Sequence, residues 1–236
     1  MYTGSAAHYD RVYSSFKDYA AEAEAIAARI REVHPPARTV LDVACGTGAH
    51  AAVLGAVHGF EVDGIDLDPV LVAIAAAKCP RGRFVQADMI DFDLGRAYDA
   101  VLCLFGSIAY MVTRPRLWAA LARLRAHLMP GGMAVVEPFL TPEAFGAGRT
   151  GSITAASEGF CVTRRNRSER DGDVCRLHFD YEIAGPAGVE HSSELHELGL
   201  FTIDETLAGF AAAGLSASYD PAAAAGRGRY VATLAP

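Results

Sequence analysis

The sequence lacks the features that would assign it to several protein classes. Its five cysteines (45, 79, 103, 161 and 175) are odd in number and scattered, and no Cys-x-x-Cys occurs, so neither a zinc site nor a disulfide framework is indicated. No apolar run approaches the ~20 residues of a membrane span. The N-terminus has neither the basic nor the apolar region of a signal peptide. We therefore expect a cytoplasmic protein that has no metal site and does not enter a membrane.

Positive charge is also scarce. The chain has 21 lysines and arginines against 28 acidic residues, and its formal net charge is −7. Binding to duplex nucleic acid needs a strongly basic face. The sequence therefore predicts no nucleic-acid partner and favours a small-molecule ligand.

The chain does contain a regular alternation of strand and helix patterns up to about residue 140. Short apolar strands joined by helices and short loops indicate βαβ units, and hence an α/β fold with a parallel sheet and helices on both faces. The expected strands are 40–43, 60–66, 83–86, 98–105 and 133–136, and the expected helices are 19–33, 50–57, 69–78 and 114–128, the last ended by Pro130-Gly131-Gly132.

The pattern changes after Thr141. Residues 175–183 alternate apolar and polar side chains without a break, which predicts a half-buried antiparallel strand flanked by 160–166 and 191–200. A helix at 203–213 and a strand at 229–234 then resume the α/β pattern. We expect an α/β core with an N-terminal lid segment (1–140), an antiparallel β insertion for substrate or dimer contacts (141–200), and the last core elements (201–236).

A strand opens through glycines into a helix at residues 39–48, Thr-Val-Leu-Asp-Val-Ala-Cys-Gly-Thr-Gly. Such a turn brings backbone N–H groups close to a ligand. The spacing is that of a dinucleotide site without its third glycine, because Ala51 stands there. An acid, Asp66, follows the next strand, where it can accept hydrogen bonds from ribose hydroxyls. These two features are compatible with either NAD or S-adenosylmethionine (SAM).

The next motifs favour SAM. Asp88, directly after the third strand, can accept from the adenine amine, and Met89 can lie against the adenine ring, whereas Ala44–Gly48 can approach the methionine end. Neither this Asp-Met pair nor the Pro-Gly-Gly before the fifth strand belongs to the NAD fingerprint.

The successive segments LDVACGTG, GIDLD, QADM, YDAVLCLFGSIAY and HLMPGGMAVVEPF resemble the motifs of small-molecule class I SAM-dependent methyltransferases. The similarity extends to KDYAAEA, the EPF and PEAF segments, HxxxLFT, AAGL and GRGRYV, which resemble the N,N-dimethyltransferases of TDP-linked amino-deoxysugars in antibiotic biosynthesis. The resemblance covers nearly the whole chain. It implies methyl transfer from SAM to a sugar amine, a substrate site between the sheet edge and the β insertion, and a homodimer.

The resemblance and the motifs together give a set of candidate site residues. The residues expected to contact SAM are Tyr13, Tyr19, Ala44, Gly46, Gly48, Asp66, Leu67, Asp88, Met89, Leu104 and Phe105. The candidate substrate contacts are Tyr2, Ser107, Glu137, Phe139, His178 and Arg227, with Tyr110 as a positioning residue. The sequence departs from the family pattern at Phe139-Leu140 and at Asp220–Gly226, so another small natural-product acceptor, methylated on nitrogen, oxygen or carbon, stays open.

Three of these substrate assignments follow from residue chemistry. Tyr110 can hold the amine, and Glu137 can orient an ammonium. Arg227, flanked by glycines, can approach a phosphate. The dense arginine run 164–176 contains acids as well, so we expect a solvated hairpin there. His178 and His196 lie on strands whose polar face can border the cleft, although a structural role is the simpler interpretation of each.

Overall fold

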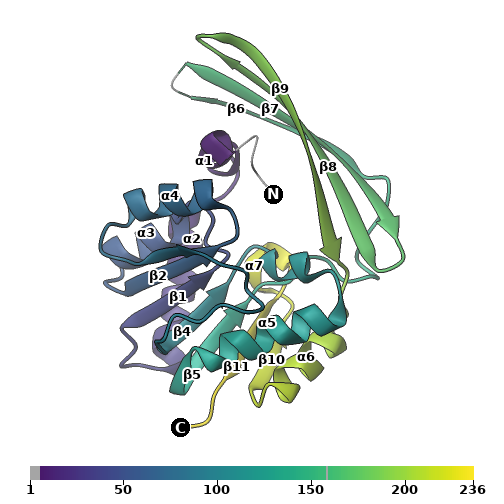
Figure 1. Ribbon diagram of the computed structural model, residues 1–236. Helices are drawn as coiled ribbons and strands as arrows, with labels where there is room; N and C mark the ends of the chain where they lie inside the picture. Colours follow the sequence, from purple (N-terminus) through teal and green to yellow (C-terminus); the bar gives the residue numbers. More distant parts are fainter. Residues whose placement is uncertain (1–5, 158) are drawn as a thin grey trace.

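The computed structural model describes residues 6–157 and 159–236, which form two β-sheets (Figure 1). The strands of the larger sheet are β1 (Thr39–Val43), β2 (Glu61–Asp66), β3 (Phe84–Gln86), β4 (Tyr98–Cys103), β5 (Leu128–Val136), β10 (Ser216–Asp220) and β11 (Arg229–Thr233). Their order is β10-β11-β5-β4-β1-β2-β3. Strands β1 to β5 pair in parallel, whereas β11 pairs antiparallel with β5 and with β10. The predicted α/β architecture is confirmed.

Helices cover both faces of this sheet. Helices α2 (Tyr19–Val33) and α3 (Ala49–Ala56) pack on one face, and α5 (Arg114–Ala126) and α6 (Ile203–Ala212) pack on the other. The alternation of side chains along β1 shows this division, because Val40 belongs to the cluster with α2 and α3 while Leu41 belongs to the cluster with α5. Residues 40–43 of β1 are therefore all buried, as expected for a parallel strand covered on both sides.

The ends of the helices follow from local sequence. The Asp18 side chain accepts from the Ala21 N–H at the start of α2, and Asp68 caps α4 (Pro69–Lys78), whose first residue is proline. At α6, Thr202 and Glu205 form a capping box. These three predicted helix starts are confirmed.

The end of α5 differs from the prediction. The helix ends at Ala126, and β5 already begins at Leu128, so Pro130-Gly131-Gly132 lies inside the strand instead of separating helix from strand. The register between β4 and β5 shifts between Tyr98 and Ala100, which accommodates this irregular start.

The second sheet contains four antiparallel strands in the order β6-β7-β8-β9, with bounds β6 (Thr150–Ser157), β7 (Phe160–Asp171), β8 (Val174–Gly185) and β9 (Gly188–Gly199). The turns after β7 and β8 lie at the predicted Asp171–Asp173 and Gly185-Pro186 positions. Three of these strands were predicted. Strand β6 was not, because its residues TGSITAAS alternate only weakly. Strand β10 of the larger sheet was not predicted either.

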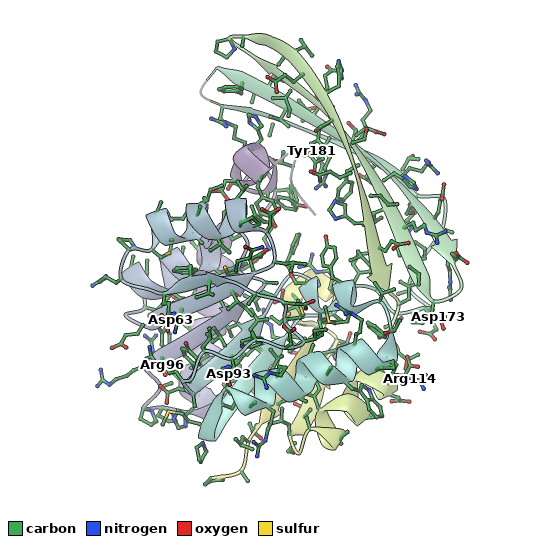
Figure 2. The ribbon with its side chains drawn as sticks, viewed as in Figure 1. Asp63, Asp93, Arg96, Arg114, Asp173 and Tyr181 are labelled. Carbon is green, nitrogen blue, oxygen red and sulfur yellow. The ribbon has the colours of Figure 1, made fainter. Side chains whose placement is uncertain are left out.

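A short N-terminal segment lies between the two sheets. It comprises η1 (Ala6–His8) and α1 (Tyr9–Tyr13), and it packs on β6 and β7. Val12 and Tyr13 share an apolar cluster with Val162, Phe179 and Tyr181 of the second sheet. Figure 2 shows Tyr181 on the side of that sheet that faces α1. The segment η2 (Ser107–Met111) lies beside β9 and ties the other end of the second sheet to the core.

None of the helices within the described residues is long and apolar enough to cross a membrane.

Candidate active site

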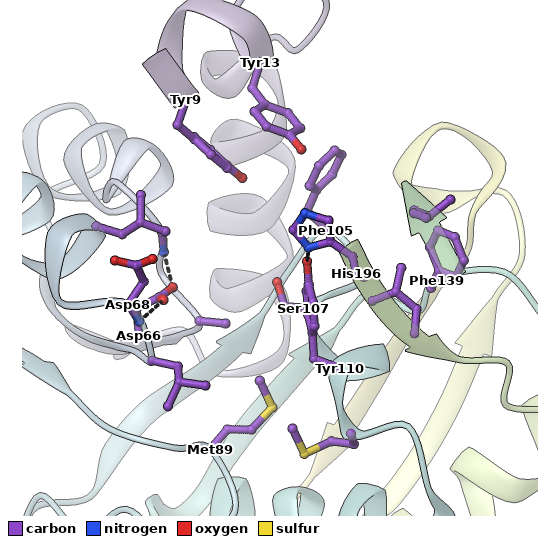
Figure 3. A pocket seen from close by; sticks show the side chains of 18 of the residues that line it. Tyr9, Tyr13, Asp66, Asp68, Met89, Phe105, Ser107, Tyr110, Phe139 and His196 are labelled. Carbon is purple, nitrogen blue, oxygen red and sulfur yellow. Dashed lines mark hydrogen bonds between the residues drawn. The ribbon is translucent and has the colours of Figure 1, made fainter. Parts of the chain in front are cut away.

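A cavity of about 410 Å³ lies at the carboxyl ends of the parallel strands. Its walls come from the loops after β1, β2, β3 and β4, from α1, and from the inner face of the four-stranded sheet (Figure 3). A smaller pocket of about 40 Å³ lies next to it, behind the glycine turn after β1, and both share Ala44 and Gly46. Strand β1 is flanked by β2 and β4, so the cavity sits where the strand order changes direction, the usual ligand site of such sheets.

The glycine turn after β1 places backbone against the cavity. Ala44 and Gly46 both have positive φ, 59° and 57°, and both line the cavity. The Gly46 N–H donates to the Asp66 carboxylate over 2.8 Å. Gly48 lines neither pocket, and a Cβ there would lie 3.0 Å from the Ala75 Cβ, so this glycine lets α3 approach α4. The structure thus gives Gly48 a role in helix packing, while its predicted contact with a ligand stays a prediction.

Asp66 ends β2 at the cavity. Besides the bond from Gly46, its carboxylate accepts from the Asp68 N–H over 3.0 Å. Burial raises the pKa of Asp66, and these two backbone N–H groups act in the opposite direction. A carboxylate held by two backbone donors keeps further lone pairs for ligand hydroxyls. Leu67, half exposed, also lines the cavity.

Asp88 and Met89 follow β3 and line the same cavity. The Ile90 N–H donates to Asp88 Oδ1 over 3.2 Å, and the Arg116 guanidinium lies 3.2 Å from Oδ2. Met89 is buried, and its thioether faces the cavity floor in Figure 3. The pair thus offers a polar acceptor beside a flat apolar surface, as an adenine requires.

The smaller pocket contains charged groups that the sequence analysis did not select. Asp42, on β1, is 2% exposed, and its Oδ2 has no hydrogen-bond partner among the described residues. Burial raises the pKa of Asp42 to about 6. Lys17 also lines this pocket, with Nζ 2.9 Å from Glu22 and 3.6 Å from the Phe105 ring centre. Tyr19 and Leu104, both predicted, line this pocket and not the larger cavity.

Glu22, from α2, holds this charged group together. Its Oε2 lies 2.9 Å from Lys17 Nζ and 2.8 Å from His50 Nε2. Burial acts to raise the pKa of Glu22, but the bonds from His50 and Lys17 outweigh it and lower the pKa to about 2. Glu22 does not line the pocket itself, but it fixes Lys17 and His50, which do. Asp42 and Lys17 thus offer partners for an ammonium and for a carboxylate, respectively.

Two tyrosines of α1 cover the cavity. Tyr9 and Tyr13 stack with ring centres 4.2 Å apart, and Tyr13 meets Phe105 edge to face at 5.6 Å. Both rings project from α1 toward the cavity in Figure 3. Tyr13 was predicted as a SAM contact and Tyr9 was not, although their spacing of four residues places them on one helical face. Tyr2 lies outside the described residues.

The turn after β4 supplies Phe105, Ser107 and Tyr110. Phe105 has φ 56°, and its N–H donates to Glu137 Oε2 over 2.9 Å. Ser107 lines both pockets, and Tyr110 lines the larger one. The Tyr110 hydroxyl lies 2.8 Å from His196 Nδ1, as the dashed line in Figure 3 shows.

Glu137 does not line either pocket, contrary to the prediction of a substrate contact. Its carboxylate is buried, accepts two bonds from Arg229 at 2.8 and 3.2 Å, and accepts the Phe105 N–H. Its charge is thus balanced by a neighbouring strand, and its role is to fix the turn that carries Phe105.

The inner face of the four-stranded sheet forms the opposite wall. Arg164, on β7, is buried, and its guanidinium lies 4.5 Å from the Phe179 ring centre and 5.2 Å from that of Tyr13. Its Nε and Nη1 have no hydrogen-bond partner among the described residues. The expectation that the whole arginine run is solvated is therefore wrong for Arg164, whereas its neighbour Arg165 is exposed.

The two histidines on these strands lie on opposite faces. His196 is 1% exposed, lines the cavity and contacts Phe179 at 4.9 Å. His178 lies outside the cavity, and its Nε2 is 3.5 Å from Glu169. The expectation that the polar face of β8 borders the cleft is wrong, because the apolar face carrying Phe179 turns inward.

Phe139 and Arg227, both predicted as substrate contacts, complete the wall of the cavity. The Arg227 guanidinium lies 4.6 Å above the Phe105 ring and 4.0 Å from Glu137 Oε2. Arg164 and Arg227 thus border a cavity that carries Asp66, Asp68 and Asp88 on its other side, where Arg116 pairs with Asp88. Among residues 6–157 and 159–236, no group of three or more histidine, cysteine, aspartate or glutamate side chains is placed to bind a metal.

The chain is similar to known methyltransferases in sequence. Residues 40–132 match the family described as "Methyltransferase domain". The dTDP-3-amino-3,6-dideoxy-alpha-D-glucopyranose N,N-dimethyltransferase of Streptomyces fradiae is 40% identical over 232 residues, covering 97% of this chain and 91% of that protein. The dTDP-3-amino-3,4,6-trideoxy-alpha-D-glucopyranose N,N-dimethyltransferase of Streptomyces venezuelae is 39% identical, covering 94% of each.

Solved structures give the same result. The chain is similar to DesVI of Streptomyces venezuelae, with a TM-score of 0.90, 39% identity, and coverage of 97% of this chain and 98% of that one. It is also similar to SAM-bound CalS10, an amino pentose methyltransferase of Micromonospora echinaspora involved in calicheamicin biosynthesis. That comparison gives a TM-score of 0.83, 40% identity, and coverage of 93% and 92%.

Proposed function

The chain belongs to the SAM-dependent amino-sugar N,N-dimethyltransferases, and from this premise we propose that it methylates the amino group of a TDP-linked amino-deoxysugar. The observation that carries the proposal is the identity of about 40% over nearly the full length of both chains, which includes the four-stranded sheet and not only the SAM-binding core. That sheet forms one wall of the cavity, so the similarity extends to the side that would hold the acceptor.

The residues present fit SAM. A buried carboxylate oxygen of Asp42 without a partner among the described residues, next to Lys17, suits the ammonium and carboxylate of the methionine end. Asp66 retains lone pairs for the ribose hydroxyls, and Asp88 with Met89 suits the adenine. When bound, SAM supplies an electrophilic methyl group on its sulfonium.

The contribution of this chain to the reaction is positioning. An amine must be neutral and in line with the methyl group, and holding both reactants in one cavity supplies much of the rate. Tyr9 and Tyr13 cover the cavity from α1 and exclude water, and Phe105 and Phe139 line it with apolar surface. Tyr110 directs its oxygen toward the site at which we place the amine.

The substrate's diphosphate is assigned to the two guanidiniums of the opposite wall. Arg164 has two nitrogens without protein partners, and Arg227 has its Nε in the same state, within the described residues. Arginine matches phosphate through bidentate contacts, and stacking on Phe179 and Phe105 holds both side chains in place. A buried, unpaired guanidinium is costly to retain, which favours an anionic ligand there.

A second candidate is methylation of another small natural product. Phe139 lines the cavity and Leu140 packs beside it, where an aromatic pair is the family pattern. Asp220–Gly226 forms part of β10 and the short helix α7 (Ala223–Gly226) directly before Arg227. Both departures border the acceptor side, so they bear on which acceptor is used and not on the methyl donor.

We also propose a cytoplasmic homodimer in which residues 141–200 act as a substrate and dimer module between core segments 1–140 and 201–236. Val189 and Leu195 of β9, 59% and 50% exposed, supply apolar surface for such contacts. Light scattering of the purified protein tests the dimer, and a monomeric mass would contradict it.

The test of function is turnover with SAM and TDP-3-amino-3,6-dideoxyglucose, followed by mass spectrometry for one or two added methyl groups. The matched control is the same nucleotide sugar with a hydroxyl in place of the amine. Methylation of the amine but not of the control supports the proposal. Binding of SAM without any methylated amino sugar would refute the acceptor and favour the second candidate.

A further inference from the structure

Three polar side chains form a continuous hydrogen-bonded row that starts in the cavity and ends in the buried interior of the four-stranded sheet. The Tyr110 hydroxyl is 2.8 Å from His196 Nδ1, and His196 Nε2 is 3.2 Å from Glu194 Oε2. Tyr110 and His196 line the cavity, whereas Glu194 does not. The side chains of His196 and Glu194 are 1% and 4% exposed, so bulk water does not separate the three groups.

The fold explains how these residues meet. Glu194 and His196 are two residues apart on β9, so they point to the same face of the sheet. Their cross-strand partners on β8, Phe179 and Leu177, show that this face is the inner, apolar one. Tyr110 comes from η2, which packs against β9. A glutamate and a histidine on an apolar strand face are expensive to bury unless they are paired, as they are here.

The arrangement fixes the direction of each hydrogen bond. A carboxylate can only accept, so His196 Nε2 carries the hydrogen that points to Glu194. In the neutral imidazole, Nδ1 is then the acceptor, and the Tyr110 O–H donates to it. Tyr110 lines the cavity, so its phenolic oxygen is within reach of a ligand N–H group there.

We propose that Tyr110, His196 and Glu194 are a proton relay that takes the proton of an ammonium bound in the cavity. This inference rests on the proposed function, because it assigns the acceptor amine to the Tyr110 end of the cavity. Tyr110 is the catalytic residue, since its oxygen meets the amine, and His196 and Glu194 are positioning residues that act through it.

The proton transfer balances as follows. The ammonium N–H bond breaks, and its proton binds the Tyr110 oxygen while the Tyr110 O–H proton moves to His196 Nδ1. The products are a neutral amine, a neutral tyrosine and an imidazolium paired with the Glu194 carboxylate. The amine lone pair is then available to the methyl group, and the imidazolium loses its proton to solvent after product leaves. A dimethylation would use the relay twice, because the first methyl transfer yields a new ammonium.

The relay has a defined pH dependence. A free amine needs no relay, so the relay contributes most at a pH at which the acceptor is an ammonium. The charged and titratable groups around His196 come from several elements. They are Tyr110 from η2, Glu194 from its own strand, Tyr181 of β8 and Arg164 of β7, which both contact Phe179, and Tyr9 and Tyr13 of α1 across the cavity.

The kinetic test compares pH profiles of kcat/KM for wild type, Tyr110→Phe and His196→Gln with the amino sugar. Without the relay, only free amine reacts, so the acid limb moves to higher pH. We expect kcat/KM to fall about tenfold near pH 6.5 and by less at pH 9. This effect is smaller than the usual range of general acid–base catalysis, because the solution also supplies free amine. Glu194→Gln gives a smaller shift in the same direction. A loss of constant size at every pH would overturn the relay and leave only packing roles.

The matched control is His178→Gln, which changes a histidine on the outer face of the neighbouring strand. Its pH profile is expected to match that of wild type. Binding of SAM by calorimetry checks that each variant is folded, and an unchanged affinity separates a lost relay from a collapsed site.

A second measurement does not depend on turnover. Nitrogen NMR of the eight histidines, with His196 assigned by its absence in His196→Gln, reports which ring nitrogen carries hydrogen. Hydrogen on Nε2 in the neutral form is expected, and hydrogen on Nδ1 alone would overturn the relay. If wild type methylates no amino sugar, the proposed function fails, while the NMR result still decides the direction of the hydrogen bonds.

Discussion

The two walls of the cavity are assembled in different ways. On the core side, each acid follows a parallel strand and is held by nearby backbone: Asp66 by the Gly46 and Asp68 N–H groups, and Asp88 by that of Ile90. On the side of the four-stranded sheet, Arg164 and His196 come from strands β7 and β9, with β8 between them. They share the cavity only because the register of three strands aligns their faces.

The charges of the two walls differ as well. The core wall contributes Asp66, Asp68 and Asp88, with Arg116 paired to Asp88, and the opposite wall contributes Arg164, with Arg227 from the segment before β11. An acidic wall suits a ligand rich in hydroxyls and amines, and a basic wall suits phosphates. We therefore expect donor and acceptor to be recognised by separate parts of the chain, so that substitutions in one wall leave the other ligand's binding nearly unchanged.

The largest expected effect is on the core wall, at Asp66. Asp66→Ala removes an acceptor of two ribose hydrogen bonds and releases the Gly46 N–H, for a loss of about 4 kcal/mol, or roughly a thousandfold in the Kd of SAM. Calorimetry measures it. Asp66→Asn, which retains one oxygen for the backbone donors, should lose less.

Asp91→Asn is the control for Asp66, because Asp91 is an exposed acid close to the same wall. Its affinity for SAM should equal that of wild type. An Asp66→Ala protein that binds SAM normally would remove the ribose role from this residue and weaken the division between the walls.

The next effect concerns Asp42 and is a pH dependence of stability. Burial raises the pKa of Asp42 from 3.8 to about 6, so the folded state binds this proton more tightly than the unfolded state. The resulting stabilisation is present below about pH 4 and is lost as pH rises to about 6. Asparagine does not titrate. We therefore expect the free energy of unfolding of Asp42→Asn to rise by about 3 kcal/mol relative to that of wild type over this pH interval.

Urea unfolding of ligand-free wild type and Asp42→Asn at pH 4, 5, 6 and 7 measures this difference. The two free energies of unfolding should diverge between pH 4 and pH 6 and then run parallel. Free energies of unfolding that run parallel from pH 4 to pH 7 would contradict a raised pKa of Asp42. Saturating SAM should reduce the divergence if its ammonium pairs with Asp42.

Much of the core wall was predictable because its residues lie at strand ends. The glycine turn, Asp66, Asp88 and Met89 each follow a strand that the apolar pattern locates, and parallel strands bring their carboxyl ends to one edge. For Gly48 the glycine pattern does not distinguish ligand contact from packing, and in the structure its close approach is to Ala75 of α4. Asp42 was missed because an acid inside an apolar strand gives no motif.

The opposite wall was less predictable, although one signal was present. The alternation in residues 175–183 separates His178 from Phe179, but it does not say which face borders the cavity. The polar face was expected to border the cleft. In the structure the apolar face lines the cavity, and the same face packs on α1. Arg164 and Arg165 differ in the same way, since adjacent strand residues point to opposite sides. Strand β6, with its weak alternation, was not detected.

The opposite wall is tested first at Arg164. Arg164→Met keeps the apolar stem on Phe179 and removes the guanidinium, so we expect the KM for the nucleotide sugar to rise about 30-fold, or roughly 2 kcal/mol, with SAM affinity unchanged. Because the charge is buried with two unpaired nitrogens, the variant should unfold no more easily than wild type. Steady-state kinetics and thermal unfolding measure the two effects.

Arg165→Met is the control, since Arg165 is the neighbouring residue on the outer face and is 58% exposed at its side chain. Its KM should not change. If Arg164→Met weakens SAM as much as the sugar, the two walls are not separate recognition surfaces.

The smallest effect is expected at Arg227. Its side chain is 32% exposed and lies 4.0 Å from Glu137, so part of its charge is already screened or balanced. Arg227→Met should raise the KM for the nucleotide sugar about fivefold, or roughly 1 kcal/mol. The control is Arg125→Met, at an exposed position of α5, which should leave this KM unchanged.

The salt dependence of the KM distinguishes the two guanidiniums further. Screening acts more on exposed charges, so the KM effect of Arg227→Met should shrink between 50 mM and 500 mM salt while that of Arg164→Met persists. The reverse order, with Arg227 dominant and salt-resistant, would place the diphosphate against β11 and not against the four-stranded sheet.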